Sequence, residues 1–156
     1  MMTPAEAQTY CTTLTKKSGS NFYYSFLFLP KARREAMYTV YAFCKEVDNA
    51  VDEPPPGSHP QEELVRWRRE LAAAYDGTPT FPVTISLAKH VRELSIPQAY
   101  FEELIKGVEM DLTSTRYATF DQLSLYCYRV ASVVGLICLH VFGTTSPRAQ
   151  DYAVNL

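Results

Sequence analysis

The stretch Phe43-Cys-Lys-Glu-Val-Asp-Asn-Ala-Val-Asp-Glu53 combines helical periodicity with two aspartates, Asp48 and Asp52, spaced four residues apart. Side chains at this spacing lie on the same face of a helix, about one turn apart. Helical steps backward from Asp48 reach Cys44, Tyr41 and Met37. The two acids therefore fall within the apolar stripe of an amphipathic helix, and we expect them to point inward.

Two ionised carboxylates on an inward face need compensation, because an unpaired buried charge is costly. A pocket that holds a divalent cation is the simplest explanation. The alternative is a solvated helix face, on which acids at this spacing are common. Lys45 precedes Asp48 by three residues and either neutralises this acid or contacts an anionic ligand. Both roles stay open from the sequence.

Length and charge limit the class of protein. A chain of 156 residues with 47% hydrophobic content fits one domain with a sizeable core. The formal net charge of −2 and the isoelectric point near 5.9 give no general attraction to nucleic acid. An anionic substrate would therefore need local basic groups or a metal, and we expect no nucleic-acid partner.

The four cysteines all fall in helical patterns without metal-ligand spacing, so we expect reduced core thiols. The first residues lack the features of a signal peptide, which favours a cytoplasmic location. The most apolar run, Val130 to Phe142, contains Ser132 and His140 and is too short to span a bilayer. We expect a buried core helix there. Peripheral contact with a membrane, in bacteria the inner membrane, stays open.

Helix signals follow one another along the whole chain, without a competing strand pattern, so the predicted class is all-α. The sequence Thr3-Pro4-Ala5-Glu6 is a capping box, and Pro54 to Gly57 ends the long central helix. The last helix stops in mid-pattern without a C-cap, so we expect a truncated chain. The expected helices run to Lys16, from Lys31 to Asp52, from Pro60 to Gly77, from Val83 to Leu94, from Ser95 to Asp111 or Leu112, from Gln122 to Phe142, and from Arg148 to Leu156.

Three segments, Ser18 to Pro30, Tyr41 to Glu53, and Tyr126 to Ala131 with Gly135, resemble motifs of the squalene and phytoene synthase family. The likeness is greatest to bacterial presqualene diphosphate synthases of the hopanoid pathway. The resemblance implies that residues 1–156 form a single all-helical domain, the N-terminal half of an isoprenoid synthase bundle. In this family a second aspartate-rich motif would lie beyond Leu156.

The resemblance also implies residue roles. Asp48 and Asp52 would bind Mg²⁺ that bridges to a substrate diphosphate, and Tyr126 is counted with them among the catalytic residues. The predicted diphosphate contacts are Ser18, Ser20, Asn21 and Lys45. The predicted walls of the prenyl cavity are Phe22, Phe26, Tyr41 and Tyr126. Asp111, near Glu109, is the one other acidic candidate, and we expect a structural role for it.

The activity that the resemblance implies is the Mg²⁺-dependent condensation of two farnesyl diphosphates to presqualene diphosphate. One alternative is phytoene synthesis from geranylgeranyl diphosphate. A second is a non-catalytic helical module that binds a partner, and a third is a structural bundle with a solvated acid pair. The sequence has no G-x-G-x-x-G fingerprint, so NADPH is not among the expected cofactors.

Overall fold

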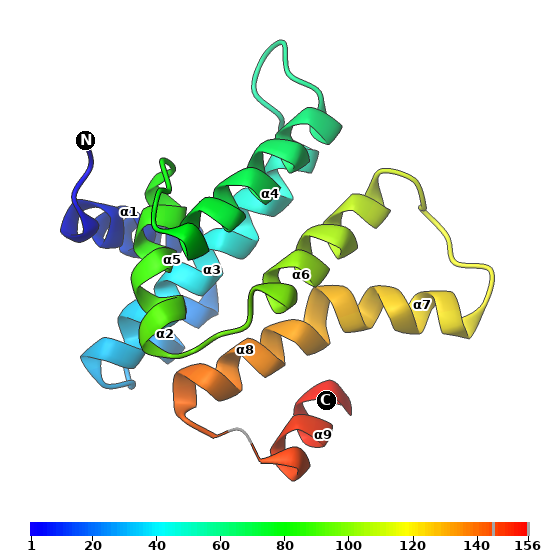
Figure 1. Cartoon of the computed structure of the whole chain (residues 1–156). Helices are drawn as coiled ribbons and strands as arrows, with labels where there is room; N and C mark the ends of the chain where they lie inside the picture. The colour runs from blue at the N-terminus through cyan, green and yellow to red at the C-terminus, as the bar shows by residue number, and fades with distance from the viewer. Residues whose placement is uncertain (145, 156) are drawn as a thin grey trace.

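The computed structural model describes residues 1–144 and 146–155, and within them every regular element is a helix. The predicted all-α class is therefore confirmed. Figure 1 shows the helices in chain order. Their bounds are α1 Pro4–Lys17, α2 Asn21–Phe26, α3 Lys31–Asp52, α4 Pro60–Asp76, α5 Pro82–Glu93, α6 Gln98–Asp111, α7 Phe120–Cys127, the π-helical turn η1 Tyr128–Ser132, α8 Val133–Phe142, and α9 Pro147–Asn155.

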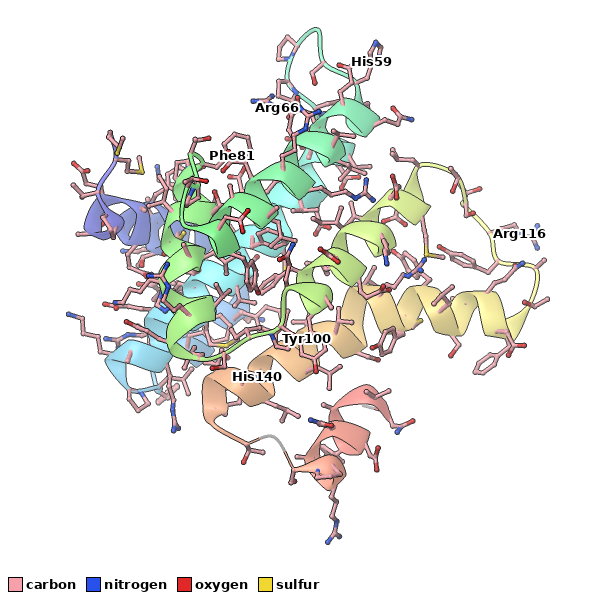
Figure 2. All side chains as sticks on the ribbon, viewed as in Figure 1. His59, Arg66, Phe81, Tyr100, Arg116 and His140 are labelled. Carbon is pink, nitrogen blue, oxygen red and sulfur yellow. The ribbon has the colours of Figure 1, made fainter. Side chains whose placement is uncertain are left out.

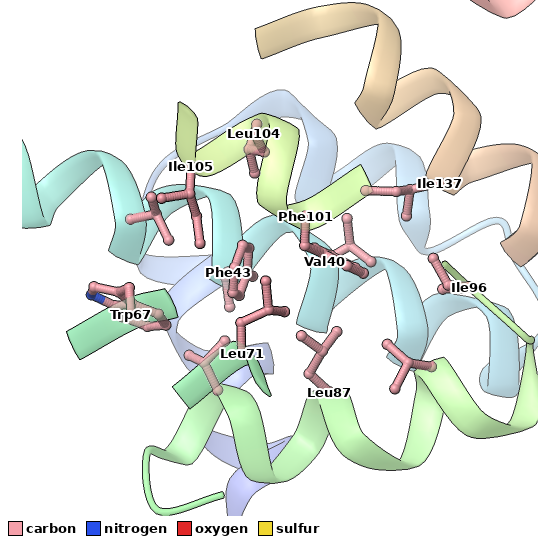
Figure 3. Close-up of a cluster of buried hydrophobic side chains, with 14 of the residues drawn as sticks. Val40, Phe43, Trp67, Leu71, Leu87, Ile96, Phe101, Leu104, Ile105 and Ile137 are labelled. Carbon is pink, nitrogen blue, oxygen red and sulfur yellow. The ribbon is translucent and has the colours of Figure 1, made fainter. Parts of the chain in front are cut away.

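The long helix α3 is the central element, and it contacts α1, α2, α4, α5, α6 and α8. Its bounds agree with the prediction from the sequence. The core on one face of α3 is built around Phe43, whose ring packs edge-on against Trp67 of α4 at 5.6 Å and Phe101 of α6 at 5.1 Å. Figure 3 shows this cluster, which also contains Leu71, Leu87 and Ile105.

Local signals set several helix ends. Thr3 accepts a hydrogen bond from the Glu6 amide and donates one from its own amide to the Glu6 carboxylate, which completes the predicted capping box. At the C-terminal end of α4, Gly77 adopts φ of 90°, a left-handed conformation that favours glycine. The predicted end of the last helix, Leu156, lies outside the described residues.

The predicted helix from Gln122 to Phe142 differs from the structure in two ways. It begins earlier, at Phe120, because Thr119 and not Asp121 caps its first turn. It is also interrupted by η1, a π-helical turn over Tyr128–Ser132. Near its far end, His140 packs against Tyr100 of α6, with ring centroids 5.9 Å apart (Figure 2).

The run from Val130 to Phe142 was expected to be a buried core helix, but it is less buried than expected. Val133, Leu136, Ile137 and Val141 are buried, but only 22% of the most apolar window of the whole helix lies inside the protein. The continuous run Phe120–Phe142 is long and apolar enough to cross a bilayer by length and composition. Core helices of globular proteins pass the same test. The expectation that all cysteines are core residues is also wrong, because Cys127 is exposed.

Candidate active site

An apolar cavity of about 660 Å³ lies along α3 beside the Phe43 cluster, and Val40 and Leu104 belong to both. From Met37 to Asp52 its α3 wall extends about 22 Å, at 1.5 Å per residue. The helices α2, α6, α7 and α8 and the turn η1 supply the rest. The lining residues are Phe22, Phe26, Met37, Val40, Tyr41, Cys44, Asp48, Asp52, Leu104, Val108, Asp111, Tyr126, Val130, Ala131, Val134, Cys138 and Phe142.

Asp48 and Asp52 lie on this wall, in line with Cys44, Tyr41 and Met37. The helical stripe inferred from the sequence is therefore confirmed. Both aspartates stay exposed, since the cavity is open to solvent at their position. Solvent therefore lowers the cost of these charges, while the carboxylates still face an apolar chamber.

Asp111, at the end of α6, reaches the same cavity from the opposite wall. This position brings Asp111 to the predicted site, and its structural role stays a prediction. Its Oδ2 accepts a hydrogen bond of 3.4 Å from the Tyr126 hydroxyl. The sequence could have indicated this position, because Leu104, Val108 and Asp111 have the spacing of one helical face and the first two are apolar. Glu109 points elsewhere and forms an ion pair with Arg68 at 2.6 Å.

The three carboxylates influence one another. Partial burial, followed by the negative charges of Asp52 and Asp111, raises the pKa of Asp48 to about 6, and the Lys45 charge opposes this shift. Burial and the hydrogen bond to Asp111 raise the pKa of Tyr126 to about 12. Excess negative charge at one end of the cavity is the condition that a bound cation would relieve.

The aromatic part of the predicted site is also brought together. Phe22 stacks on Phe26 at 6.0 Å and packs against Tyr41 at 6.2 Å. The Tyr41 hydroxyl donates a hydrogen bond of 3.1 Å to the Ser18 hydroxyl. This bond fixes Tyr41 in the cavity wall and connects the wall to the turn before α2.

Four predicted site residues lie outside the cavity lining. Ser18 follows α1 and is linked to the cavity wall by its hydrogen bond with Tyr41. Ser20 caps α2 by accepting a hydrogen bond from the Phe22 amide, and Asn21 is the first residue of that helix. Lys45 is exposed on α3 and acts on the site through its charge. Their contacts with a diphosphate stay predictions.

The turn η1 forms the wall that faces α3, through Val130 and Ala131. It lies directly against Gly107 of α6, where an added Cβ would come within 2.8 Å of both Arg129 Cβ and Val130 Cγ1. Arg129 also donates a hydrogen bond of 3.0 Å to Glu103 of α6. Glycine at this position allows the close approach that sets the width of the cavity there.

The donor set suits a hard divalent cation. Asp48 and Asp52 offer oxygen ligands one turn apart, and Mg²⁺ commonly takes one or two carboxylates together with phosphate and water. Within residues 1–144 and 146–155, no three His, Cys, Asp or Glu side chains are close enough to form a cage on their own. Asp48 and Asp52 would therefore supply only part of the ligand set of such a cation.

An elongated apolar cavity with acidic residues at one end fits an amphiphile whose anionic head is bridged by a cation. A model of the squalene/phytoene synthase family matches residues 15–156, and the chain belongs to that family. Members of the family are prenyltransferases that act on prenyl diphosphates and use a divalent metal.

Individual relatives agree with this assignment. The chain is 37% identical over 150 residues to a phytoene synthase of Arthrospira platensis, covering 94% of this chain and 48% of that protein. It is 39% identical over 126 residues to a presqualene diphosphate synthase of Rhodopseudomonas palustris, covering 80% and 45%. A squalene synthase structure from Alicyclobacillus acidocaldarius superposes with a TM-score of 0.89 at 28% identity, covering 97% of this chain and 57% of the other. The chain thus spans about half the length of these relatives.

Proposed function

We propose that this chain is part of a head-to-head prenyltransferase that condenses two farnesyl diphosphates to presqualene diphosphate. Its cavity would bind the first of the two substrates. The observation that carries the proposal is the cavity in which an apolar wall about 22 Å long ends at Asp48 and Asp52. Its volume of about 660 Å³ lies in the range of small-molecule sites, roughly 300 to 1000 Å³.

In the proposed reaction, the C–O bond of one substrate breaks and its diphosphate leaves. The double bond of the second substrate then attacks the resulting allylic cation, and loss of a proton closes a cyclopropane ring. Bound Mg²⁺ would neutralise the diphosphate and make it a better leaving group. Asp48 and Asp52 would hold that ion, and their position directs the head of the substrate to the open end.

The rings of Phe22, Phe26, Tyr41 and Tyr126 have a separate role in this proposal. Each lines the cavity, and the negative face of an aromatic ring attracts a cation. The Tyr126 hydroxyl stays protonated at neutral pH, since its pKa is raised to about 12. These rings would therefore stabilise a carbocation without acting as bases, while the apolar wall excludes water that would otherwise quench it.

A second candidate has a specific observation in its favour. Several of the relatives are named phytoene synthases, among them that of Arthrospira platensis. Phytoene synthesis would use the same carboxylates and rings with geranylgeranyl diphosphate, whose tail is one isoprene unit longer. The discriminating feature is the depth of the cavity beyond Met37 and Phe142, which lie toward its apolar end.

The test is binding of the unreactive thio-analogues of farnesyl and geranylgeranyl diphosphate, measured by calorimetry with and without Mg²⁺. We expect binding that requires Mg²⁺ and is lost in Asp48→Ala, with the farnesyl analogue preferred. Glu53→Ala, an exposed acid next to the pair, is the matched control and should bind normally. Equal binding by Asp48→Ala and the parent chain would refute the metal role.

Turnover is tested separately, by product analysis with both diphosphates on the longest protein that the native reading frame encodes. Presqualene diphosphate supports the first proposal and phytoene the second. Mg²⁺-dependent binding with neither product would favour the non-catalytic binding module.

A further inference from the structure

The segment from Lys16 to Arg34 differs in charge from the rest of the chain. It carries five basic residues and no acidic residue, while all 17 acidic residues of this chain of net charge −2 lie elsewhere. It also holds five aromatic residues, at positions 22, 23, 24, 26 and 28. Basic and aromatic side chains together are typical of surfaces that contact the headgroup region of a bilayer.

The apolar residues at the tip of this segment are largely exposed. None of the six residues of α2 is buried. Tyr24, Leu27 and Phe28 are 64%, 45% and 92% exposed, and we call these three residues the aromatic tip. Tyr23 holds α2 in place by stacking on the buried Tyr38, with ring centroids 5.4 Å apart. The aromatic tip is therefore an exposed apolar surface on an anchored helix.

Cations follow the aromatic tip in the sequence, at the start of α3. The Lys31 side chain is 81% exposed and only loosely paired with Glu35, at 3.8 Å, and Arg33 is exposed. Arg34 donates a hydrogen bond of 3.4 Å to the Leu27 carbonyl, which ties the start of α3 to the tip. An acidic lipid headgroup complements this charge. A second copy of the same surface does not, because a two-fold contact would bring like charges together.

The aromatic tip is continuous with the cavity, since Phe22 and Phe26 of the same short helix line it. We propose that Tyr24, Leu27 and Phe28 insert into the interface of an anionic bilayer, with Lys31 and Arg33 on the lipid phosphates, so that the cavity opens toward the membrane. The proposal rests on the proposed function, because a prenyl diphosphate is an amphiphile that partitions into such an interface. This contact would make the protein peripheral to the membrane.

The test is co-sedimentation of the chain with vesicles of phosphatidylcholine alone and of phosphatidylcholine mixed equally with phosphatidylglycerol. We expect binding mainly to the anionic vesicles. The variant Leu27→Ser/Phe28→Ser should bind more than about tenfold more weakly, since two apolar side chains lose their burial. Lys31→Gln/Arg33→Gln should weaken binding to the anionic vesicles only.

A matched control is present on α7, where Leu123 and Phe120 are 41% and 80% exposed. This helix lies at the other end of the molecule from α2 and is part of the run that could cross a bilayer by composition (Figure 1). Leu123→Ser/Phe120→Ser should bind vesicles like the parent chain. Loss of binding in this pair, with normal binding in Leu27→Ser/Phe28→Ser, would overturn the proposal.

Two further measurements separate this proposal from the proposed function. If the parent chain binds the farnesyl thio-analogue in solution but not the vesicles, only the membrane proposal fails. If it binds vesicles through the aromatic tip but not the analogue, only the proposed function fails. A change in self-association of Leu27→Ser/Phe28→Ser by light scattering, without any vesicle binding by the parent, would identify a protein interface and overturn the membrane proposal.

Discussion

Both faces of α3 carry apolar residues, but the two faces have different structural roles. On one face, Phe43, Val47 and Ala50 are buried against α4, α5 and α6. On the other face, Met37 and Tyr41 lead along an open cavity to Asp48 and Asp52. Apolar character alone therefore does not distinguish a packed core from a ligand chamber. The carboxylates do, because an acid is tolerated only where solvent or a cation can reach it.

Truncation of Phe43 should have the largest effect on stability. Its ring is fully buried between Trp67 and Phe101, so Phe43→Ala should lower the free energy of unfolding by about 3 to 5 kcal/mol. Denaturant unfolding measures this loss. The matched variant on the cavity face, Phe26→Ala, should cost less than about 1.5 kcal/mol, because Phe26 is only partly buried. Equal losses would contradict the distinction between the two faces.

Gly107→Ala tests the contact that shapes the cavity wall. The new methyl group would overlap Arg129 and Val130, so we expect a loss of about 1 to 3 kcal/mol despite the better helix propensity of alanine. Gly135→Ala is the control, since its Cβ would lie 3.1 Å from the Ala153 carbonyl oxygen of the short last helix. It should be tolerated better. A stable Gly107→Ala would show that η1 moves freely.

The two faces of α3 also show which structural features could be predicted from the sequence. The bounds of α3 and the stripe from Met37 to Asp52 follow from a helical period within one segment, and both were predicted. The position of Asp111 opposite Asp48 was not predicted, because it depends on the packing of α6 and α3, which are far apart in sequence. The π-helical turn at Tyr128–Ser132 was also missed; it packs against Gly107 of α6, a contact that a pattern within one segment does not reveal.

Glu70 provides a test on the packed side, through pH. Burial alone would raise its pKa, but hydrogen bonds from Thr80, Phe81 and Thr84 outweigh that effect and lower it. The ionised form is thus favoured by folding, so its contribution is present above the pKa of the unfolded state. It is lost as the pH falls through the lower pKa of the folded state.

Glu70→Gln should therefore cost about 1 to 2 kcal/mol at pH 7, and the difference from the parent chain should shrink in acid. Unfolding curves across this pH range measure both values. Glu62→Gln, an exposed acid on the same helix, should stay within about 0.5 kcal/mol of the parent at every pH. A pH-independent loss in Glu70→Gln would mean that packing, and not charge, explains the effect.

Asp48→Asn should have the smallest effect on stability, with the opposite sign. Because the pKa of Asp48 is raised to about 6, its ionised form is disfavoured by folding, and this penalty is present above pH 6 and absent in acid. Removing the charge should stabilise the chain at pH 7 by less than about 1 kcal/mol, since solvent screens an exposed carboxylate. The same variant should lose Mg²⁺-dependent binding of the diphosphate analogue. Stabilisation together with lost binding is the result expected of a residue kept for a ligand at a cost to the fold, whereas destabilisation would place Asp48 with the structural residues of the opposite face.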